Sequence, residues 1–227
     1  MNSKKYYEIK FVLYIEFSND IKNNKKLLDK YNERILEHNK NMFFNSYYDS
    51  GFDLLMKNQD LKIPKNEVKL VSLDIKCACY NFDNTIKPKK IPVYKFIENS
   101  FKRGILKCVK PYPFKIFPRS SMWKKGVLLA NSTGIIDSGY RGFLFAPLFS
   151  FKDDNIIEYN DTSEELRLLR LSFRGLKKNI HTEKTARMNN RYVQICMPGL
   201  ERFLIKVVDK LNTNTSRCEG GCGSTGN

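Results

Sequence analysis

The sequence predicts an all-β body with helical additions. Short stretches in which apolar residues alternate with polar ones, or run together, recur along much of the chain and are typical of strands. Two longer, highly charged stretches instead space their apolar residues three or four positions apart, as an amphipathic helix does. Strands that outnumber helices in this way favour a β core with helices attached to it.

The first half of the chain predicts a strand, a helix and a second strand. Residues 9–17 (IKFVLYIEF) are rich in β-branched and aromatic residues, which favour a strand. Residues 19–41 carry apolar side chains at near-helical spacing among charges, so they predict an amphipathic helix. Pro64 and Asn66 then signal a turn, and the alternating residues 68–80 predict a strand.

The second half predicts four more strands and two helices. The strands are predicted over residues 126–130, 142–151, 192–197 and 203–208. The helices are predicted over residues 94–103 and 162–178.

Length and charge limit the classes of protein to consider. The chain has 227 residues, which suggests one domain, and its net charge of +16 with a pI of about 9.5 favours acidic partners. Nucleotides, nucleic acids and anionic surfaces all meet that description. Many lysines alternate with asparagine and isoleucine, so a solvated lysine-rich surface explains most of the charge, with non-specific nucleic-acid contact as the alternative.

The chain carries no apolar run of about 18 residues and no hydrophobic segment at its N-terminus. We therefore expect an intracellular protein, in the cytoplasm or nucleus, that has no membrane partner and keeps its cysteines reduced. Cys218 and Cys222 form a close pair, but His38 and His181 lie in polar stretches far from them. A zinc site is disfavoured on this spacing, and buried or incidental thiols are favoured.

The glycine-dense ending RCEGGCGSTGN has two readings. Its glycines let a backbone approach a ligand closely, and Arg217, Ser224 and Thr225 offer donors that suit a phosphate. Taken alone, however, such a segment is more often a frayed terminus.

The segment NSTGIIDSGYRG, residues 131–142, also has two readings. Gly134 and Gly139 bracket two apolar residues and Asp137, which predicts a β-hairpin with a constrained turn. Asp137 could orient and deprotonate a water molecule there, or could be an ordinary turn residue that bonds its own backbone.

Three further segments carry polar candidates. PRSS, residues 118–121, places Arg119 and Ser120 where a loop or short helix starts and where backbone N–H groups favour anions; a serine there can equally be a plain N-cap. Gln194 could be a surface strand residue, and Asp53 could be a strand-edge residue.

Five segments together resemble, in order, the motifs of the trimeric dUTP pyrophosphatase (dUTPase) family, which read approximately AGYDL, PRSG, GVIDxDYRG, GxRIAQ and RGxGGFGSTG. The segments here are YDSGFDLL (48–55), PRSS (118–121), NSTGIIDSGYRG (131–142), NNRYVQI (189–195) and the glycine-dense ending (217–227). Each is weak alone, but their shared order makes chance similarity improbable. The recognisable stretches cover about half of the chain.

The resemblance implies a fold and a domain organisation. The fold would be a dUTPase-like distorted jelly-roll or β-clip barrel with helical insertions. Residues 1–227 would form one such domain, with insertions at 18–42, 81–110 and 158–188. Residues 217–227 would be a mobile tail that closes over the phosphates.

The resemblance also implies an activity, which is Mg²⁺-dependent hydrolysis of dUTP to dUMP and pyrophosphate by a homotrimer with shared active sites. Asp137 matches the family aspartate that positions the attacking water, and Asp53 matches one that contacts Mg²⁺ through water. Arg191 is expected to be structural. The implied phosphate contacts are Arg119, Ser120, Ser121, Gln194, Arg217, Ser224 and Thr225. The implied uracil and deoxyribose contacts are Asn131, Ser132, Thr133, Gly134, Tyr140 and Cys222.

Several departures leave alternatives. Cys222 replaces a phenylalanine that would stack on uracil, and Gly139 replaces a second aspartate, so a divergent or slow enzyme is one outcome. A dCTP deaminase shares this fold, but Pro147 stands where that reaction needs a glutamate base. A non-catalytic scaffold that binds nucleic acid or a protein through basic residues 87–110 and 167–184 is the other alternative.

Overall fold

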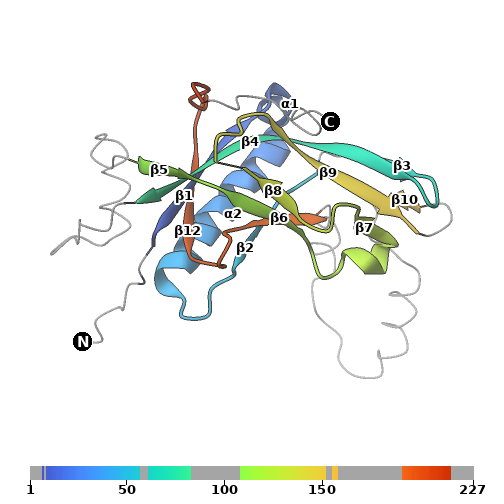
Figure 1. Cartoon of the computed structure of the whole chain (residues 1–227), viewed down its shortest axis with the longest axis horizontal. Helices are drawn as coiled ribbons and strands as arrows, with labels where there is room; N and C mark the ends of the chain where they lie inside the picture. The colour runs from blue at the N-terminus through green and yellow to red at the C-terminus, as the bar shows by residue number, and fades with distance from the viewer. Residues whose placement is uncertain are drawn as a thin grey trace, which may run out of the picture.

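A computed structural model describes residues 7, 9–56, 61–82, 108–151, 155–157 and 191–215 (Figure 1). The helices are α1 (Asn19–Asn23), α2 (Lys25–Phe44) and the 3-10 turn η1 (Met122–Lys125). The strands are β1 (Phe11–Phe17), β2 (Gly51–Asp53), β3 (Leu61–Ile63), β4 (Val68–Phe82), β5 (Cys108–Tyr112), β6 (Phe114–Pro118), β7 (Val127–Leu129), β8 (Gly134–Ile136), β9 (Phe143–Ser150), β10 (Asn155–Ile157), β11 (Val193–Cys196) and β12 (Phe203–Val207). The predicted β body with helical additions is confirmed. The helices predicted at 94–103 and 162–178 lie outside the described residues.

The strands form two main sheets. The larger has the order β12-β1-β4-β9-β7, with β5 also paired to β4, and the smaller has the order β2-β11-β6-β8. β10 and β3 form a two-stranded ribbon. Most pairs are antiparallel, but β1 and β12, from opposite ends of the described chain, pair in parallel.

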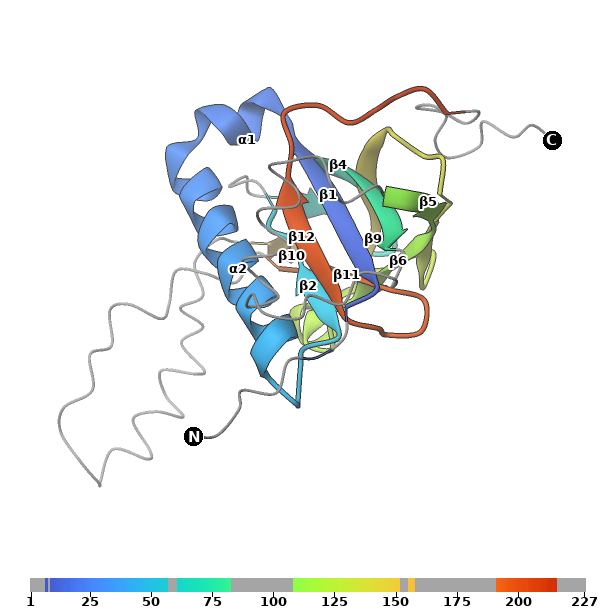
Figure 2. The ribbon, with the colours of Figure 1, turned by 90° about the vertical axis from the view of Figure 1, so that its left-hand side faces the viewer.

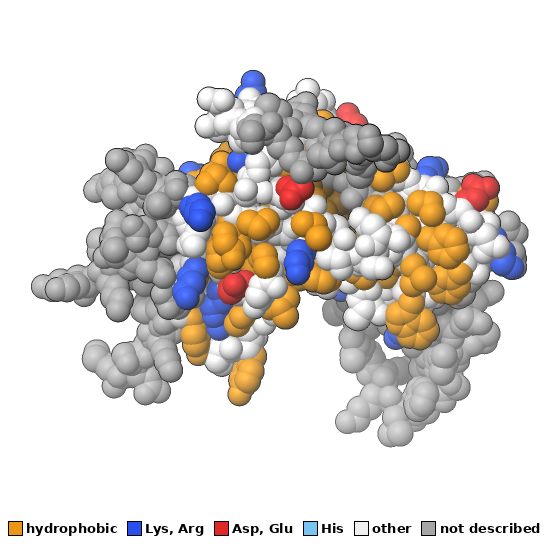
Figure 3. Space-filling view, in the orientation of Figure 1, with side chains coloured by type: hydrophobic (Ala, Val, Ile, Leu, Met, Phe, Trp, Pro, Cys, Tyr) orange, Lys and Arg blue, Asp and Glu red, His pale blue; other side chains and the backbone are white. Residues whose placement is uncertain are grey.

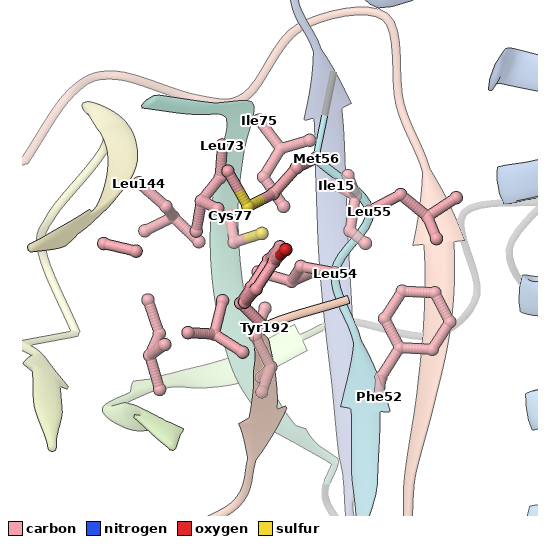
Figure 4. Close-up of a cluster of buried hydrophobic side chains, with 14 of the residues drawn as sticks. Ile15, Phe52, Leu54, Leu55, Met56, Leu73, Ile75, Cys77, Leu144 and Tyr192 are labelled. Atoms are coloured by element: carbon pink, nitrogen blue, oxygen red, sulfur yellow. The ribbon is translucent and has the colours of Figure 1, made fainter. Parts of the chain in front are cut away.

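The two sheets share one hydrophobic core. Ile15 and Ile75 enter it from the larger sheet, whereas Phe114 and Ile195 enter it from the smaller one, and all four are at most 2% exposed. Figure 4 shows side chains from both sheets meeting around Tyr192 and Leu54. Burial of these side chains supplies the main favourable term that holds the sheets face to face.

Strand β4 bends where it changes partners. Its first residues pair with β9, and its later ones pair with β1. Between them, Asp74 adopts a positive φ of 55°, and its backbone N–H donates to Ser72 Oγ at 3.1 Å. The Ser18 backbone N–H donates to the Asp74 carbonyl at 2.9 Å, which fixes the bend against the start of α1.

The helix predicted over residues 19–41 is broken at Asn24. The Asn24 backbone leaves the helical region (φ −94°, ψ 85°), and its side chain accepts a hydrogen bond from the Leu27 backbone N–H at 3.1 Å. An N-cap in mid-stretch starts a second helix, so the prediction of one continuous helix is wrong at this residue.

Helix α2 lies beside the edge strands of both sheets (Figure 2). The Asn39 side chain makes two 2.9 Å hydrogen bonds with the backbone of Ile205 in β12. At the other sheet, the Tyr31 hydroxyl bonds both the N–H and the carbonyl of Leu55, just after β2, at 2.9 Å. An edge strand exposes unpaired backbone groups. α2 covers the edges of both sheets, and these hydrogen bonds fix its position.

The hairpin predicted around Asp137 is not formed. β8 pairs with β6 in the smaller sheet, whereas β9 pairs with β4 and β7 in the larger one. The two strands that flank Asp137 therefore belong to different sheets. The chain crosses between the sheets in the loop that holds Asp137, because both strands find longer partners elsewhere.

His38 is buried in the inner face of α2 and should make the protein less stable in mild acid. Burial lowers the pKa of His38 to about 4, against the ordinary 6.5, although its Nε2 lies 3.1 Å from the Phe203 carbonyl. Below pH 6.5 His38 becomes protonated in the unfolded chain but stays neutral in the folded chain. At pH 5 the free energy of unfolding should fall by about 2 kcal/mol from this group alone.

Urea denaturation of the wild type and of His38→Gln between pH 7.5 and 5 measures this effect. Glutamine keeps a donor near the Phe203 carbonyl but does not titrate, so the stability difference between the two proteins should shrink as the pH falls. A difference that stays constant over this range would show that His38 does not resist protonation.

None of the helices that the structure describes is both long and apolar enough to cross a membrane.

Candidate functional site

A large polar cavity opens beside β2, β11 and the end of β6. Its volume is about 960 Å³, which is at the upper end of the usual range for ligand sites. Side chains from α2, β2, the end of β6 and β11 line it. The polar lining residues are Arg34, Glu37, His38, Asn41, Asp49, Ser50, Asp53, Arg119, Ser120, Arg191 and Gln194.

Three arginines converge on Asp53 in this cavity. Arg119 Nε lies 2.8 Å from Oδ1 of Asp53. Arg191 Nη1 and Arg34 Nη2 lie 2.7 Å and 3.2 Å from Oδ2. Arg119 lies in the loop between β6 and η1, Arg191 lies just before β11, and Arg34 lies in α2. These three segments are far apart in the sequence. We call these four residues the arginine cluster.

The arginine cluster carries more positive than negative charge. One carboxylate faces three guanidinium groups, and arginine stays protonated in proteins. Burial lowers the pKa of Arg34, and the nearby Arg191 lowers it further, with Asp53 acting in the opposite direction. Such crowding favours binding of an anion with several oxygen atoms, and phosphate is the anion that arginine forks match best.

Four of the residues predicted from the sequence meet here. Asp53, Arg119, Ser120 and Gln194 all line the cavity. β6 and β11 bring them together, because Gln194 pairs with Phe117 on one side and with Asp53 on the other. Ser121, by contrast, is not among the lining residues and takes the N-cap position of η1 without a side-chain cap bond.

Gly51 leaves room for the side chain of Gln194. A Cβ at residue 51 would collide with the Gln194 side-chain amide and would lie 3.0 Å from Cys196 Sγ. Gln194 Nε2 also donates to the Pro118 carbonyl at 3.4 Å. The missing side chain at Gly51 therefore lets Gln194 lie against β2 at the cavity wall.

Arg34 was not predicted as a site residue, although the sequence held a signal for it. Tyr31, Ile35 and His38 are all buried in α2, and Arg34 falls on the same stripe by helical spacing. A charged residue on a buried stripe needs a partner, so it marks either an ion pair or a ligand site. Arg191 was expected to be structural; it is part of the cavity wall and of the arginine cluster.

Asp137 lies away from the cavity within one chain. Ile136 pairs with Phe114 at the start of β6, and Asp137 comes next, whereas Arg119 follows Pro118 at the other end of β6. Asp137 is thus level with residue 113, six positions before Arg119, and six extended residues span about 20 Å. Asp137 is exposed and is not a lining residue, so one chain does not bring it to the arginine cluster.

The other predicted nucleoside contacts also lie outside the cavity. Asn131, Ser132 and Thr133 form the turn between β7 and β8, where Ser132 has a positive φ of 57°. Gly134 starts β8. Tyr140 packs against the core, and its hydroxyl donates to the Phe143 carbonyl at 2.7 Å.

Buried Arg141 fixes the loop that follows Asp137. Its guanidinium donates to the carbonyls of Ser138 at 2.9 Å, Tyr140 at 2.7 Å and Asn212 at 3.0 Å. Thr215 Oγ1 donates to the Gly139 carbonyl at 2.6 Å. The backbone around Asp137 is therefore held to the last described segment of the chain.

The residues present do not form a magnesium site on their own. Both oxygens of Asp53, the predicted ligand through water, already bond guanidinium groups. Among the described residues, no group of three or more His, Cys, Asp or Glu side chains could hold a metal ion. Magnesium would have to draw most of its oxygen ligands from substrate and water.

Cys196 at the cavity wall is a neutral thiol. Burial, together with the nearby Asp53 carboxylate, raises its pKa to about 11. A thiol that stays protonated is a poor nucleophile, so the side chain serves packing rather than covalent chemistry. Cys77 and Cys79 are likewise buried and unbridged, which agrees with the expected reduced thiols.

Several predicted residues cannot be placed. Arg217, Cys222, Ser224 and Thr225 lie outside the described residues. So do all of residues 158–188, which include the basic segment 167–184, and most of residues 81–110, which include the basic segment 87–110.

Comparison with known proteins gives one curated relative and several solved structures. No family model matches the chain. The deoxyuridine 5'-triphosphate nucleotidohydrolase of Escherichia phage T5 is 28% identical over 111 residues, which is 49% of this chain and 56% of that relative. The chain thus spans little more than half the length of the curated relative it matches.

Two solved structures are similar at low scores. The dUTPase from Streptococcus mutans gives a TM-score of 0.34 at 17% identity, covering 74% of this chain and 90% of that one. The native EIAV dUTPase gives a TM-score of 0.33 at 18% identity, covering 74% and 87%.

Proposed function

We propose, on the premise that the chain is related to the dUTPase family, that it hydrolyses dUTP to dUMP and pyrophosphate. The observation that carries this proposal is the meeting of Arg119, Ser120 and Gln194 in one polar cavity, beside the arginine cluster. They come from two segments more than 70 residues apart in the sequence, and the resemblance to the family assigns each of them to the phosphates. An unrelated β protein would have no reason to bring them together.

The complete site would form between chains. Asp137 and the arginine cluster lie at opposite ends of β6, too far apart to act on one phosphate group. A second copy that places its Asp137 loop at the mouth of the cavity would complete the site. This supports the expected homotrimer with shared active sites, since a head-to-tail contact with a rotation of one third of a turn closes into a ring of three.

An exposed apolar surface offers a place for such a contact. Val68 and Leu70 in β4, Leu128 in β7 and Phe145 in β9 are 40–56% exposed. The strand register puts them on one face, because Val68 and Leu128 both pair with Phe149. Figure 3 shows hydrophobic side chains gathered over the region of β9 and β7. A patch of this kind on a sheet face is typical of a protein interface.

The reaction would need no covalent intermediate. Asp137 of one chain would orient a water molecule and accept its proton as the water oxygen attacks the α-phosphorus. The bond from that phosphorus to the bridging oxygen would break, and pyrophosphate would leave. The arginine cluster would stabilise the charge that builds on the leaving group.

Magnesium would arrive with the substrate. The triphosphate and water would supply the oxygen ligands that the described residues lack, and the ion would neutralise charge on the phosphates. Asp53 would reach such an ion only through water, because its oxygens hold the arginines.

Separate incubations with dUTP, UTP, dTTP and dCTP, each with Mg²⁺, test the proposal. Product identification should find dUMP and pyrophosphate from dUTP, and little product from the others. Formation of dUTP and ammonia from dCTP, without release of pyrophosphate, would identify a deaminase instead. Binding of DNA without release of pyrophosphate from dUTP would favour the scaffold alternative.

Gly51→Ala should impair turnover while leaving the fold intact. Alanine is compatible with the backbone there, but its Cβ would displace the flexible side chain of Gln194 from the cavity wall. We expect kcat/KM for dUTP to fall about 10- to 100-fold, the loss of one charge-assisted bond to phosphate, with little change in the melting temperature.

The double variant Gly51→Ala with Gln194→Ala is the matched control. If Gly51 acts through Gln194, the double variant should be no worse than Gln194→Ala alone. Additive losses would show that alanine at residue 51 harms the site by another route.

A further inference from the structure

Helix α2 contributes a charged side chain to the cavity, although none of the five sequence motifs lies in α2. All of α2 except its last two residues falls within residues 18–42, a stretch that the family motifs do not include. Arg34 nevertheless lines the cavity and contacts Asp53 of β2. The side chain is 21% exposed, so it is largely buried but still open to the cavity.

Arg34 has bonding capacity left after its ion pair. A guanidinium group has five N–H donors, and Asp53 takes one at Nη2. Arg34 Nε is buried and finds no hydrogen-bond partner among the described residues. A buried donor without an acceptor is costly, and a ligand oxygen would offset that cost once the guanidinium turns its Nε toward the cavity.

The position of Arg34 is fixed by its neighbours on α2. Tyr31, one turn before it, bonds the backbone of Leu55, while His38 and Asn39, one turn after it, contact the backbone of β12. The guanidinium also lies 5.9 Å from the centre of the Phe52 ring. A side chain held on a rigid helix between two anchors is pre-organised for binding.

The Asp53 carboxylate lets three positively charged arginine side chains lie close together at one wall of the cavity. Its two oxygens hold one nitrogen from each arginine, so the three guanidinium groups lie together at the cavity wall. Without this internal counter-ion the guanidinium groups would repel one another and separate. Asp53 is thus suited to position the arginines, which differs from its predicted role beside a metal ion.

We propose that Arg34 is a phosphate-binding residue supplied by α2, and that Asp53 positions it together with Arg119 and Arg191 for a polyphosphate chain. The inference rests on the proposed function for the identity of the full substrate, but not for the anion itself. The ligand class is a chain of linked phosphates, because three forks along one wall offer more donors than a single phosphate accepts.

Calorimetric titration with inorganic tripolyphosphate tests the proposal without requiring catalysis. Arg34→Ala should weaken tripolyphosphate binding about 10- to 100-fold. Arg34→Lys should recover part of the loss, because lysine keeps the charge but not the fork. Lys26→Ala, which removes one exposed positive charge from the same helix away from the cavity, should bind as the wild type does.

The outcomes separate this inference from the proposed function. Tripolyphosphate binding that depends on Arg34, in a protein that does not cleave dUTP, would sustain the inference and reject the function. Cleavage of dUTP with an Arg34→Ala affinity equal to that of the wild type would reject the inference alone, and Arg34 would then be a structural ion pair. Should Arg34→Ala fail to fold, an affinity of Arg34→Lys equal to that of the wild type would overturn the inference.

Discussion

Asp137→Asn should reduce kcat for dUTP by about 100- to 10,000-fold, the usual contribution of a general base. Asparagine has the same shape as aspartate but cannot accept the proton of the attacking water. The side chain is exposed, so its replacement should leave the fold and the melting temperature nearly unchanged. Steady-state kinetics with pyrophosphate release as the readout measures the loss.

Two controls give this result its meaning. Affinity for a non-hydrolysable dUTP analogue should stay within about threefold of the wild type, because the arginine cluster is intact. Asp209→Asn makes the same chemical change at another exposed residue, in the loop after β12, and should keep full activity. Turnover that persists in Asp137→Asn would remove this residue from the mechanism.

Mixing two inactive variants should restore activity if each site is built from more than one chain. Asp137→Asn lacks the proton acceptor, and Arg119→Ala lacks one of the arginines that hold the phosphates. In random mixed oligomers, about a quarter of the sites would take an intact Asp137 from one chain and an intact arginine cluster from another. Co-refolding equal amounts and measuring dUTP cleavage should therefore give about a quarter of the wild-type rate.

A second mixture guards against non-specific recovery. Arg119→Ala and Gln194→Ala both damage the cavity of their own chain, so a mixture of these two should regain nothing. If both mixtures stayed inactive although the chains exchanged, Asp137 and Arg119 would have to act within one chain, and the 20 Å separation along β6 would have to close.

The sequence predicted strands well where apolar residues alternate. β4, β9 and β12 appear within two residues of the predicted bounds; β9 and the later part of β4 bury one face, whereas β12 starts with three consecutive buried residues. β5 and β6 were not predicted from the sequence, and Pro111, Pro113 and Pro118 interrupt their apolar pattern. Pro111 is tolerated because β5 pairs only with β4 and so lies at a sheet edge, where its missing N–H costs no ladder bond.

Only the site residues that belong to a family motif could be predicted from the sequence. Arg119, Ser120 and Gln194 follow from the resemblance, and their place in one cavity agrees with it. Arg34 could not be assigned in the same way, because which strand α2 packs against depends on contacts between distant residues. The role of Asp53 was likewise set by three arginines from distant parts of the chain, which no local pattern reveals.

The bent strand β4 has a consequence for how this molecule comes apart. Its front portion is shared with β9 and its rear portion with β1, so a single stretch of backbone runs through both halves of the larger sheet. Separating either half of the sheet from β4 would break backbone hydrogen bonds of the strand that also stabilises the other half. We therefore expect that the two halves of the larger sheet do not unfold separately. Heating should unfold the β body in one cooperative transition.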